Sequence, residues 1–165
     1  FGTWPQKRPS AGKARKGDIY KHKTSMSKDA QFCISQKAFI EKDGNILVLH
    51  DPVEGLDFPG GKIQEGEAID GEAVSLTRSL QREVMEETNL EVGILSPFAV
   101  WYYEFPKNHR NYPKVVYIVG FKCEYKSGDL KLSSEHDNFK WVNKSNYKKV
   151  DDGSDFFKAL EKYFI

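Results

Sequence analysis

The chain has 165 residues, which lies within the usual range for one compact domain. Hydrophobic residues make up 39% and charged residues 30% of it, so a wholly disordered or fibrous chain is excluded. No apolar run approaches the roughly 20 residues that a membrane-spanning helix needs, and the first residues lack the charged-then-apolar pattern of a signal segment. We therefore expect a cytoplasmic protein with no membrane partner.

Positive charge gathers in the first 28 residues, which hold eight Lys or Arg and one acid, Asp18. This basic arm has a net charge of +7, so the remaining residues carry −6, given the chain's total of +1. A basic arm on an acidic body can indicate a polyanionic partner such as nucleic acid. The alternative is an arm that is solvated or packs on its own domain or on a second copy, which would make a homodimer. We favour the alternative, because charge runs usually only solvate a surface.

From residue 31 the sequence predicts a β-hairpin. Alternating apolar residues predict a strand over residues 32–40, and a short apolar run predicts a second strand over residues 46–49. Between them, the four residues 42–45 have the Asp-Gly composition of a tight turn. Regular structure must break next, at Phe58-Pro59-Gly60-Gly61.

Helical and strand patterns then follow to the end of the chain. Apolar residues at spacings of three and four predict a helix over residues 72–88. Aromatic and β-branched residues predict long strands over residues 100–105 and 114–125, and a short strand over residues 139–142. Residues 154–164 predict a closing helix with one apolar side. Strands around one central helix, with another helix at the end, predict an α+β or three-layer α/β fold.

Three glutamates near the end of the predicted central helix are the first chemical signal. Glu83, Glu86 and Glu87 lie at i, i+3 and i+4, which places them on one helical face. Their charges repel one another, and the C-terminal end of a helix favours cations rather than acids. A divalent cation resolves both conflicts, because hard ions such as Mg²⁺ or Mn²⁺ take carboxylate oxygens. The alternative is a solvated acidic turn partly compensated by Arg82, and in either case we expect Glu86 and Glu87 to be exposed.

A glycine pair precedes this helix and favours the metal interpretation. Gly60-Gly61 are followed by Lys62, Glu65 and Glu67 in a loop rich in acids. Glycines let the backbone turn tightly and approach a ligand closely. A glycine loop that leads into a carboxylate-bearing helix indicates a site for phosphate and metal.

The segment from Gly60 to Leu90 resembles the signature box of the Nudix hydrolases. That box reads Gly, five residues, Glu, seven residues, Arg-Glu, an apolar residue, any residue, Glu-Glu, any residue, Gly and an apolar residue. Its fixed positions are matched here by Gly61, Glu67, Arg82, Glu83, Val84, Glu86, Glu87 and Leu90.

The chain departs from the box in two places. Residues 68–81 separate the first Glu of the box from its Arg, where the family has only seven residues, so the box carries a seven-residue insert. We expect this insert to form a short loop through Gly71 and then extra helix, with Leu76 and Leu80 packed on the sheet. Asn89 stands where the family has the closing Gly, and we expect it to adopt the same left-handed backbone conformation.

The resemblance implies an α/β/α sandwich with a mixed central sheet, a catalytic helix and a C-terminal helix, built by one domain over residues 29–165. It implies an enzyme that hydrolyses a pyrophosphate bond in a small nucleotide, namely a nucleoside diphosphate linked to another group. Nucleoside triphosphates, ADP-ribose and nucleotide sugars are substrates of this type. Mg²⁺ or Mn²⁺ would be the cofactor, since a metal neutralises phosphate oxygens and makes hydroxide available near neutral pH.

The same resemblance assigns roles within the box. Glu83 and Glu87 would be the main metal ligands, Glu86 would contribute, and the Gly60 backbone carbonyl would be a further ligand. Arg82 would orient the glutamates through charge-assisted hydrogen bonds. The three glutamates and the arginine are therefore the expected catalytic side chains.

Candidates outside the box are less specific. Glu135, on a late loop, is the candidate for the general base or an exposed loop acid, and we expect its neighbour His136 to have no chemical role. Lys62 is a candidate phosphate contact or a surface lysine. Trp101 and Tyr103 are candidate nucleobase contacts, although strand aromatics more often belong to the core.

Two other functions remain open beside the hydrolase. The first is a non-catalytic Nudix-fold module that only binds a nucleotide. The second is a pyrophosphohydrolase of RNA 5′ ends whose basic arm holds the backbone. The intact glutamate cluster favours an enzyme, and the arm lacks an RNA-binding motif, so we expect a small nucleotide rather than nucleic acid as the partner.

Overall fold

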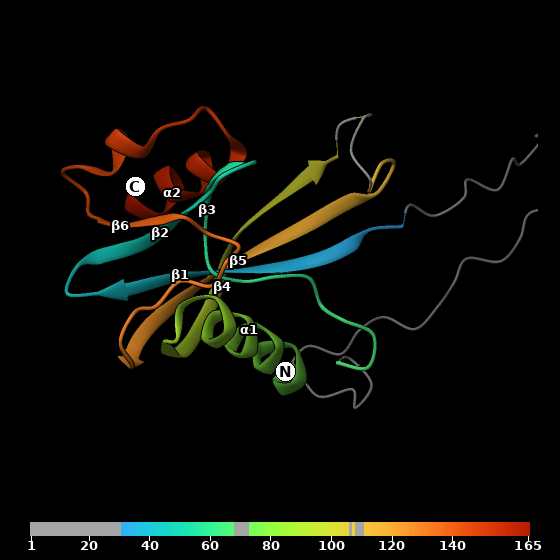
Figure 1. Ribbon diagram of the computed structural model, residues 1–165, viewed down its shortest axis with the longest axis horizontal. Coiled ribbons are helices and arrows are strands. Elements are labelled where there is room, and N and C mark those ends of the chain that lie inside the picture. Colours follow the sequence, from blue (N-terminus) through green and yellow to red (C-terminus); the bar gives the residue numbers. More distant parts are fainter. Residues whose placement is uncertain (1–30, 68–72, 106, 108–110) are drawn as a thin grey trace, which may run out of the picture. The chain divides into compact units, whose positions relative to one another are not determined.

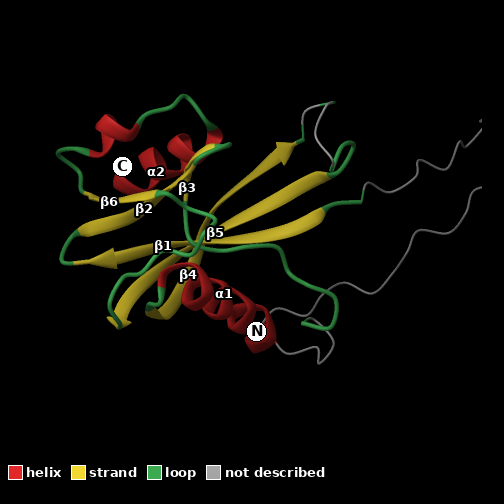
Figure 2. Cartoon of the chain, in the orientation of Figure 1, coloured by secondary structure: helices red, strands yellow, loops and turns green. Residues whose placement is uncertain are grey.

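A computed structural model describes residues 31–67, 73–105, 107 and 111–165 of the chain (Figures 1 and 2). The basic arm over residues 1–28 and the predicted loop at Gly71 lie outside the described residues. In chain order the elements are β1 (Cys33–Lys42), β2 (Asn45–Asp51), β3 (Gly55–Asp57), α1 (Ala73–Thr88), β4 (Glu91–Glu104), β5 (Val115–Ser127), β6 (Asn138–Val142), a 3₁₀-helix (Tyr147–Val150) and α2 (Asp155–Phe164).

The strands form one mixed sheet. Its order is β3-β2-β1-β5-β4, and β6 pairs with β2. β1 and β5 run parallel, with Cys33 opposite Val116 and Glu41 opposite Glu124, whereas the other paired strands run antiparallel. The mixed central sheet expected from the sequence is therefore confirmed.

The turn between β1 and β2 has the backbone that its residues favour. Asp43 and Gly44 both have positive φ, at 51° and 74°, and Lys42 lies opposite Asn45 in the ladder. Glycine and aspartate adopt this left-handed backbone more readily than most residues, and such turns match the twist of a hairpin. The predicted hairpin is thus confirmed.

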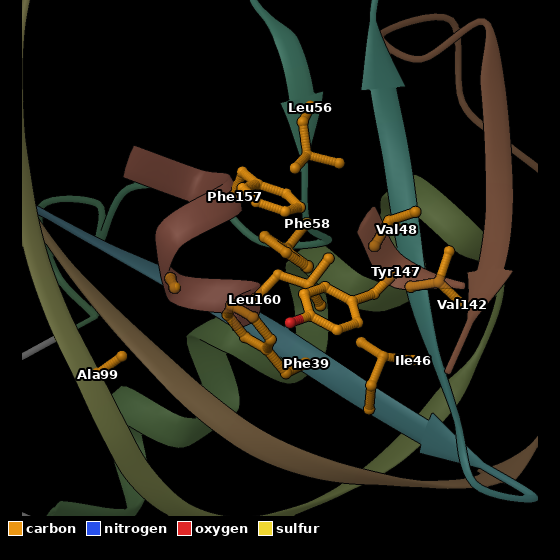
Figure 3. Close-up of a cluster of buried hydrophobic side chains, with 11 residues drawn as sticks. Phe39, Ile46, Val48, Leu56, Phe58, Ala99, Val142, Tyr147, Phe157 and Leu160 are labelled. Atoms are coloured by element: carbon orange, nitrogen blue, oxygen red, sulfur yellow. The ribbon is translucent and has the colours of Figure 1, made fainter. Parts of the chain in front are cut away.

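One face of the sheet carries an aromatic core beneath α2. Phe39 of β1 is fully buried in a cluster with Phe58 and with Leu160 of α2. The rings of Phe39 and Phe58 stack with centroids 3.9 Å apart, and Figure 3 shows both among the side chains that fill this layer.

The opposite face of the sheet carries a second core beneath α1. Ala38 and Ile40, the neighbours of Phe39 in β1, belong to this cluster together with Leu80 and Val84 of α1. Alternate residues of a strand point to opposite faces, so one strand supplies both layers. Figure 1 shows α1 and α2 on opposite sides of the sheet, and the predicted α/β/α sandwich is confirmed.

The predicted central helix is confirmed as α1, from Ala73 to Thr88. Leu80 is only 1% exposed and packs in the core, as expected, while Leu76 is half-buried. Directly after the helix, Asn89 has a φ of 57°, and its N–H donates to the Met85 carbonyl over 2.9 Å. Asn89 therefore ends the helix in the left-handed conformation that was expected of it.

Two strands differ from the prediction. β4 begins at Glu91, well before residue 100, and β3 was not predicted at all. The first half of β4 contains Gly93, Ser96 and Pro97, and its ladder with β5 shifts register between Glu91 and Val92, between Ile94 and Ser96, and between Pro97 and Ala99. Such bulges erase the alternating pattern on which strand prediction depends.

The closing helix α2 begins beside its capping residue. The Ser154 hydroxyl accepts a hydrogen bond from the Phe157 N–H over 3.2 Å, which satisfies one of the unpaired donors at the helix start. The closing helix predicted over residues 154–164 is confirmed. No helix among the described residues combines the length and the hydropathy that crossing a bilayer requires.

Candidate active site

The glycine loop runs alongside β1 and is held there by backbone hydrogen bonds. The Gln36 N–H donates to the Gly61 carbonyl over 2.9 Å, and the Ala38 N–H donates to the Pro59 carbonyl over 2.7 Å. Gly60, between these two anchors, has a φ of 132°, and a Cβ on it would lie 2.2 Å from the Gln36 carbonyl oxygen. Only glycine fits this backbone position.

Glu87 connects the end of α1 to this loop. Its Oε2 accepts a hydrogen bond from the Gly60 N–H over 2.9 Å, and the residue is only 6% exposed. Burial raises the pKa of Glu87 to about 7, against the opposing influence of the nearby Lys37 ammonium and of the Gly60 N–H. The expectation that Glu87 is exposed was therefore wrong, because the loop folds over this part of the helix face.

Glu83 lies one helical turn before Glu87 and touches the second glycine. A Cβ on Gly61 would stand 2.6 Å from the Glu83 carboxyl carbon and 2.8 Å from both of its oxygens. The Glu83 side chain is 14% exposed and accepts a hydrogen bond from Arg82 over 2.9 Å. The glycine pair thus leaves room for two carboxylates against the loop.

Arg82 contacts three carboxylates of the box at once. Its Nε and Nη2 donate to Glu67 Oε1 over 3.0 and 2.7 Å, its Nη2 also donates to Glu83, and its Nη1 donates to Glu86 Oε2 over 2.8 Å. The Gln64 N–H and the Ser79 hydroxyl complete the shell of Glu67, each over 2.7 Å.

The backbone hydrogen bond from Gln64, together with those from Ser79 and Arg82, lowers the pKa of Glu67. The insert of the box therefore leaves the contact between Glu67 and Arg82 in place. The Arg82 guanidinium joins the three carboxylates through charge-assisted hydrogen bonds.

A cavity of about 410 Å³ opens beside these residues. One part of its wall is acidic and is formed by the carboxylates of Asp51, Glu54, Asp57, Glu83, Glu87 and Glu135. Another part is aromatic and apolar and is formed by Tyr103, Phe105, Val116, Ile118 and Phe156. Polar groups that converge beside an apolar wall are typical of a small-molecule site.

A buried lysine lies in the acidic wall. The Lys37 ammonium donates to Asp57 Oδ2 over 2.8 Å and to the Gly60 carbonyl over 2.7 Å. Burial favours the neutral amine, but the charges of Asp57 and Glu87 outweigh it, and the pKa of Lys37 lies above its ordinary value. Lys37 was missed from the sequence, although a lysine between the buried apolar residues of a strand was a signal that could have found it.

His136 and Asp57 adjoin this lysine. The His136 side chain is 2% exposed, and its Nε2 lies 3.4 Å from Asp57 Oδ2. Burial disfavours the charged forms of Asp57 and His136. This cost is outweighed by their mutual contact, by the positive charge of Lys37 beside Asp57 and by the negative charge of Glu87 near His136. The pKa of Asp57 is lowered and that of His136 is raised. His136 is therefore a loop histidine that is buried in the cavity wall.

The loop that carries Glu135 and His136 is tied to the end of α1. The Ser133 N–H donates to the Glu87 carbonyl, and the Lys131 N–H donates to the Thr88 carbonyl, each over 3.0 Å. These two backbone bonds bring the loop, with its exposed Glu135, to the rim of the cavity.

Not every predicted site residue reaches the cavity. Gly60, Lys62, Glu83, Glu87, Tyr103 and Glu135 line it. The Glu86 carboxylate is 58% exposed, is bound to Arg82 and stands outside the lining. Trp101 also stands outside the lining, and its ring packs edge-on against Phe156 with centroids 5.4 Å apart.

The donor set fits a hard divalent cation. Carboxylates and a backbone carbonyl are the oxygen ligands that Mg²⁺ and Mn²⁺ take. At the loop, Glu87 is bonded to the Gly60 N–H and Glu83 lies against Gly61. The raised pKa of Glu87 reflects the cost of burying its negative charge, and a bound cation would lower that cost. As the described side chains lie, no three His, Cys, Asp or Glu residues converge closely enough to hold a metal.

Known proteins share this architecture. The NUDIX domain model matches residues 38–160. A MutT protein from Methanosarcina mazei Go1 is 25% identical with a TM-score of 0.63, over 83% of this chain and 98% of its own. A NUDIX hydrolase from Nitrosomonas europaea is 18% identical with a TM-score of 0.62, over 81% of this chain and 88% of its own.

A C. elegans Ap4A hydrolase is 21% identical with a TM-score of 0.61, over 79% of this chain and 94% of its own. The likeness to this protein and to the Nitrosomonas hydrolase shows the fold alone. No curated protein sequence matches the chain. Because the domain model covers most of the chain and includes the loop and helix that build the cavity, this protein belongs to the NUDIX domain family.

Proposed function

We propose that this protein, as a Nudix-type pyrophosphohydrolase, hydrolyses the pyrophosphate bond of a nucleoside diphosphate linked to another group, with Mg²⁺ or Mn²⁺ as its cofactor. The observation that carries the proposal is the meeting of Glu87 and Glu83 with the Gly60-Gly61 loop in a cavity that also has an aromatic wall. The similar proteins include a MutT protein and an Ap4A hydrolase. Nudix hydrolases in general use divalent metals.

The metal would be held by Glu83, Glu87 and the Gly60 carbonyl, and Glu86 would contribute from outside the cavity lining. When bound, it supplies positive charge to the phosphate oxygens and lowers the pKa of the attacking water. The chain's own residues hold this site in shape. Arg82 fixes Glu83 and Glu86 by hydrogen bonds, and the Gly60 N–H fixes the Glu87 carboxylate.

The chemical step is attack of a water oxygen on one phosphorus, with cleavage of the bridging P–O bond. The departing phosphate takes the bonding electron pair, and the proton of the attacking water passes to a carboxylate. Glu135 is our candidate for this base, because it is exposed at the rim of the cavity and a carboxylate there can reach water. Positioning of the two phosphates by the glycine loop supplies the rest of the catalysis.

The aromatic wall is the proposed seat of the nucleoside. Tyr103 and Phe105 stand in this wall with their rings 5.1 Å apart, and flat bases stack on such side chains. Lys62 lines the cavity near Phe105, with its ammonium 5.5 Å from that ring, and would contact a phosphate. A location in the cytoplasm and assembly as a homodimer stay predictions from the sequence.

The proposal is tested by measuring hydrolysis of a substrate panel. Nucleoside triphosphates, ADP-ribose, a nucleotide sugar, a dinucleoside polyphosphate and a 5′-triphosphorylated RNA would each be incubated with Mg²⁺, with Mn²⁺ and with excess EDTA. We expect a mononucleotide product from at least one small substrate, and only with metal. Tight nucleotide binding without turnover would instead identify a binding module, and cleavage of the RNA alone would identify a 5′-end hydrolase.

A further inference from the structure

The place of Lys37 in the acidic wall has a consequence for metal binding. Its ammonium donates to the Gly60 carbonyl over 2.7 Å and to Asp57 over 2.8 Å, and the side chain is only 10% exposed. A lysine in this setting is held by two acceptors and is shielded from solvent. The positive charge therefore stays at the carbonyl that the proposed function assigns to the metal.

We propose that Lys37 is a positioning residue whose ammonium acts as the resident counter-ion of the carboxylate site and competes with a divalent cation for the Gly60 carbonyl. The inference rests on the proposed function only in taking Gly60, Glu83 and Glu87 as the metal ligands. It adds a role for Lys37 and Asp57, which lie outside the Nudix box.

Two physical effects support the competition. A carbonyl oxygen that already accepts a hydrogen bond from an ammonium is a weaker ligand, because part of its electron density is engaged. In addition, two cations at one oxygen repel each other strongly where water is excluded. Asp57 holds the ammonium at the carbonyl and is itself fixed by the Phe58 N–H over 2.7 Å, although its negative charge offsets part of the repulsion.

The same contacts give Lys37 a second effect in the metal-free protein. Glu87 is buried and bonded to the Gly60 N–H, and Asp57, whose side chain is 17% exposed, is bonded to Lys37. The positive charge of Lys37 interacts favourably with both acids. Without it these acids would stand together in a poorly solvated wall, which destabilises the fold. Lys37 therefore stabilises the empty site and weakens the loaded one.

The test is Mn²⁺ binding to the full chain without substrate, followed by electron paramagnetic resonance and by titration calorimetry. Lys37→Met should bind Mn²⁺ at least tenfold more tightly than wild type. Lys37→Arg, which keeps the charge, should stay within threefold of wild type. Lys62→Met removes one charge from the same cavity without touching the Gly60 carbonyl, and should change the affinity by less than threefold.

Thermal melting separates this role from simple packing. Metal-free Lys37→Met should melt at a lower temperature than wild type, and Mn²⁺ should raise its melting temperature by more than it raises that of wild type. If Lys37→Met fails to fold without metal, Lys37→Gln, which retains a donor for the Gly60 carbonyl, replaces it in both measurements.

The outcomes distinguish the inference from the proposed function. An unchanged or weaker Mn²⁺ affinity in the neutral variants, with wild-type hydrolysis intact, overturns the role of Lys37 and leaves the hydrolase standing. Tighter Mn²⁺ binding by the neutral Lys37 variants than by wild type, Lys37→Arg and Lys62→Met supports the role of Lys37. Absence of Mn²⁺ binding and of hydrolysis in every protein overturns both.

Discussion

Glu67 accepts two hydrogen bonds from the Arg82 guanidinium, over 2.7 and 3.0 Å, although the two residues are fifteen positions apart in the sequence. The contact joins the acidic loop to the middle of α1. It shows that the longer spacing of the box is absorbed between these residues, while Arg82 still reaches both Glu67 and Glu83.

This relationship predicts a stability effect. Glu67→Gln should lower the free energy of unfolding by about 1–2 kcal/mol, because it weakens charge-assisted hydrogen bonds to a partly buried arginine. Urea denaturation measures the change. Glu65→Gln, at an exposed acid of the same loop, is the matched control and should stay within about 0.5 kcal/mol of wild type. Equal stability of the two variants would show that the contact contributes nothing.

The raised pKa of Glu87 predicts a pH dependence of stability. Its pKa of about 7 lies above the ordinary 4.5, so between these values the folded protein binds more protons than the unfolded chain. The contribution of Glu87 to the free energy of unfolding is fully present below about pH 4.5, where the carboxyl is neutral in both states, and is lost as the pH rises through 7. At roughly 1.4 kcal/mol per pKa unit, the loss amounts to about 3 kcal/mol.

Urea denaturation in EDTA at pH 5 and pH 8 measures this dependence. Glu87→Gln should lose the part of the difference that Glu87 contributes, leaving the part from His136, whose pKa is also raised. Glu86→Gln, at the exposed neighbour, should retain the whole difference. A wild-type dependence in Glu87→Gln would assign the titration to another group.

Gly61 is predicted to be required for the site rather than for the fold. In Gly61→Ala the new Cβ would meet the Glu83 carboxyl at 2.6 Å, so the side chain must move away from the loop. We expect at least a tenfold loss of kcat with a cooperative melt retained, as measured by steady-state kinetics and circular dichroism. Full turnover in this variant would show that the position of Glu83 is not critical.

Gly60 is predicted to be required for the fold itself. Gly60→Ala combines a φ of 132° with a Cβ 2.2 Å from the backbone oxygen of Gln36, and should cost more than about 3 kcal/mol. Gly153→Ala, with a φ of 77° and nothing within 4 Å of the new Cβ, should cost only about 1 kcal/mol. Chemical denaturation compares the two, and equal losses would contradict the steric argument.

The fold could be predicted where local patterns and packing agree. The Asp43-Gly44 turn and the apolar stripe of α1 both act through near neighbours, and each stands where the sequence indicates. The first half of β4 could not be predicted, because register shifts around Ser96 and Pro97 break its alternation. Ser96 and Pro97 belong to the strand because they pair with residues of the long strand β5.

The site could be predicted where its residues share one helix face. The spacing of Glu83 and Glu87 brings both to the glycine loop, but it gives no measure of how deeply the loop buries Glu87. Lys37 and His136 come from distant segments and meet only at Asp57. No local pattern encodes such a meeting, since it depends on how β1, β3 and the late loop pack together.

The glutamates of α1 offer the most direct test of the account. The kcat of a small nucleotide substrate with Mg²⁺ should be measured for Glu83→Gln, Glu87→Gln and Glu86→Gln. We predict that the first two lose at least a hundredfold while retaining a cooperative melt. The fold-loss of kcat in Glu86→Gln should be at least ten times smaller than in the other two variants, because the Glu86 carboxylate is 58% exposed and lies outside the cavity lining. Wild-type turnover in both Glu83→Gln and Glu87→Gln would contradict a metal-dependent hydrolase at this site.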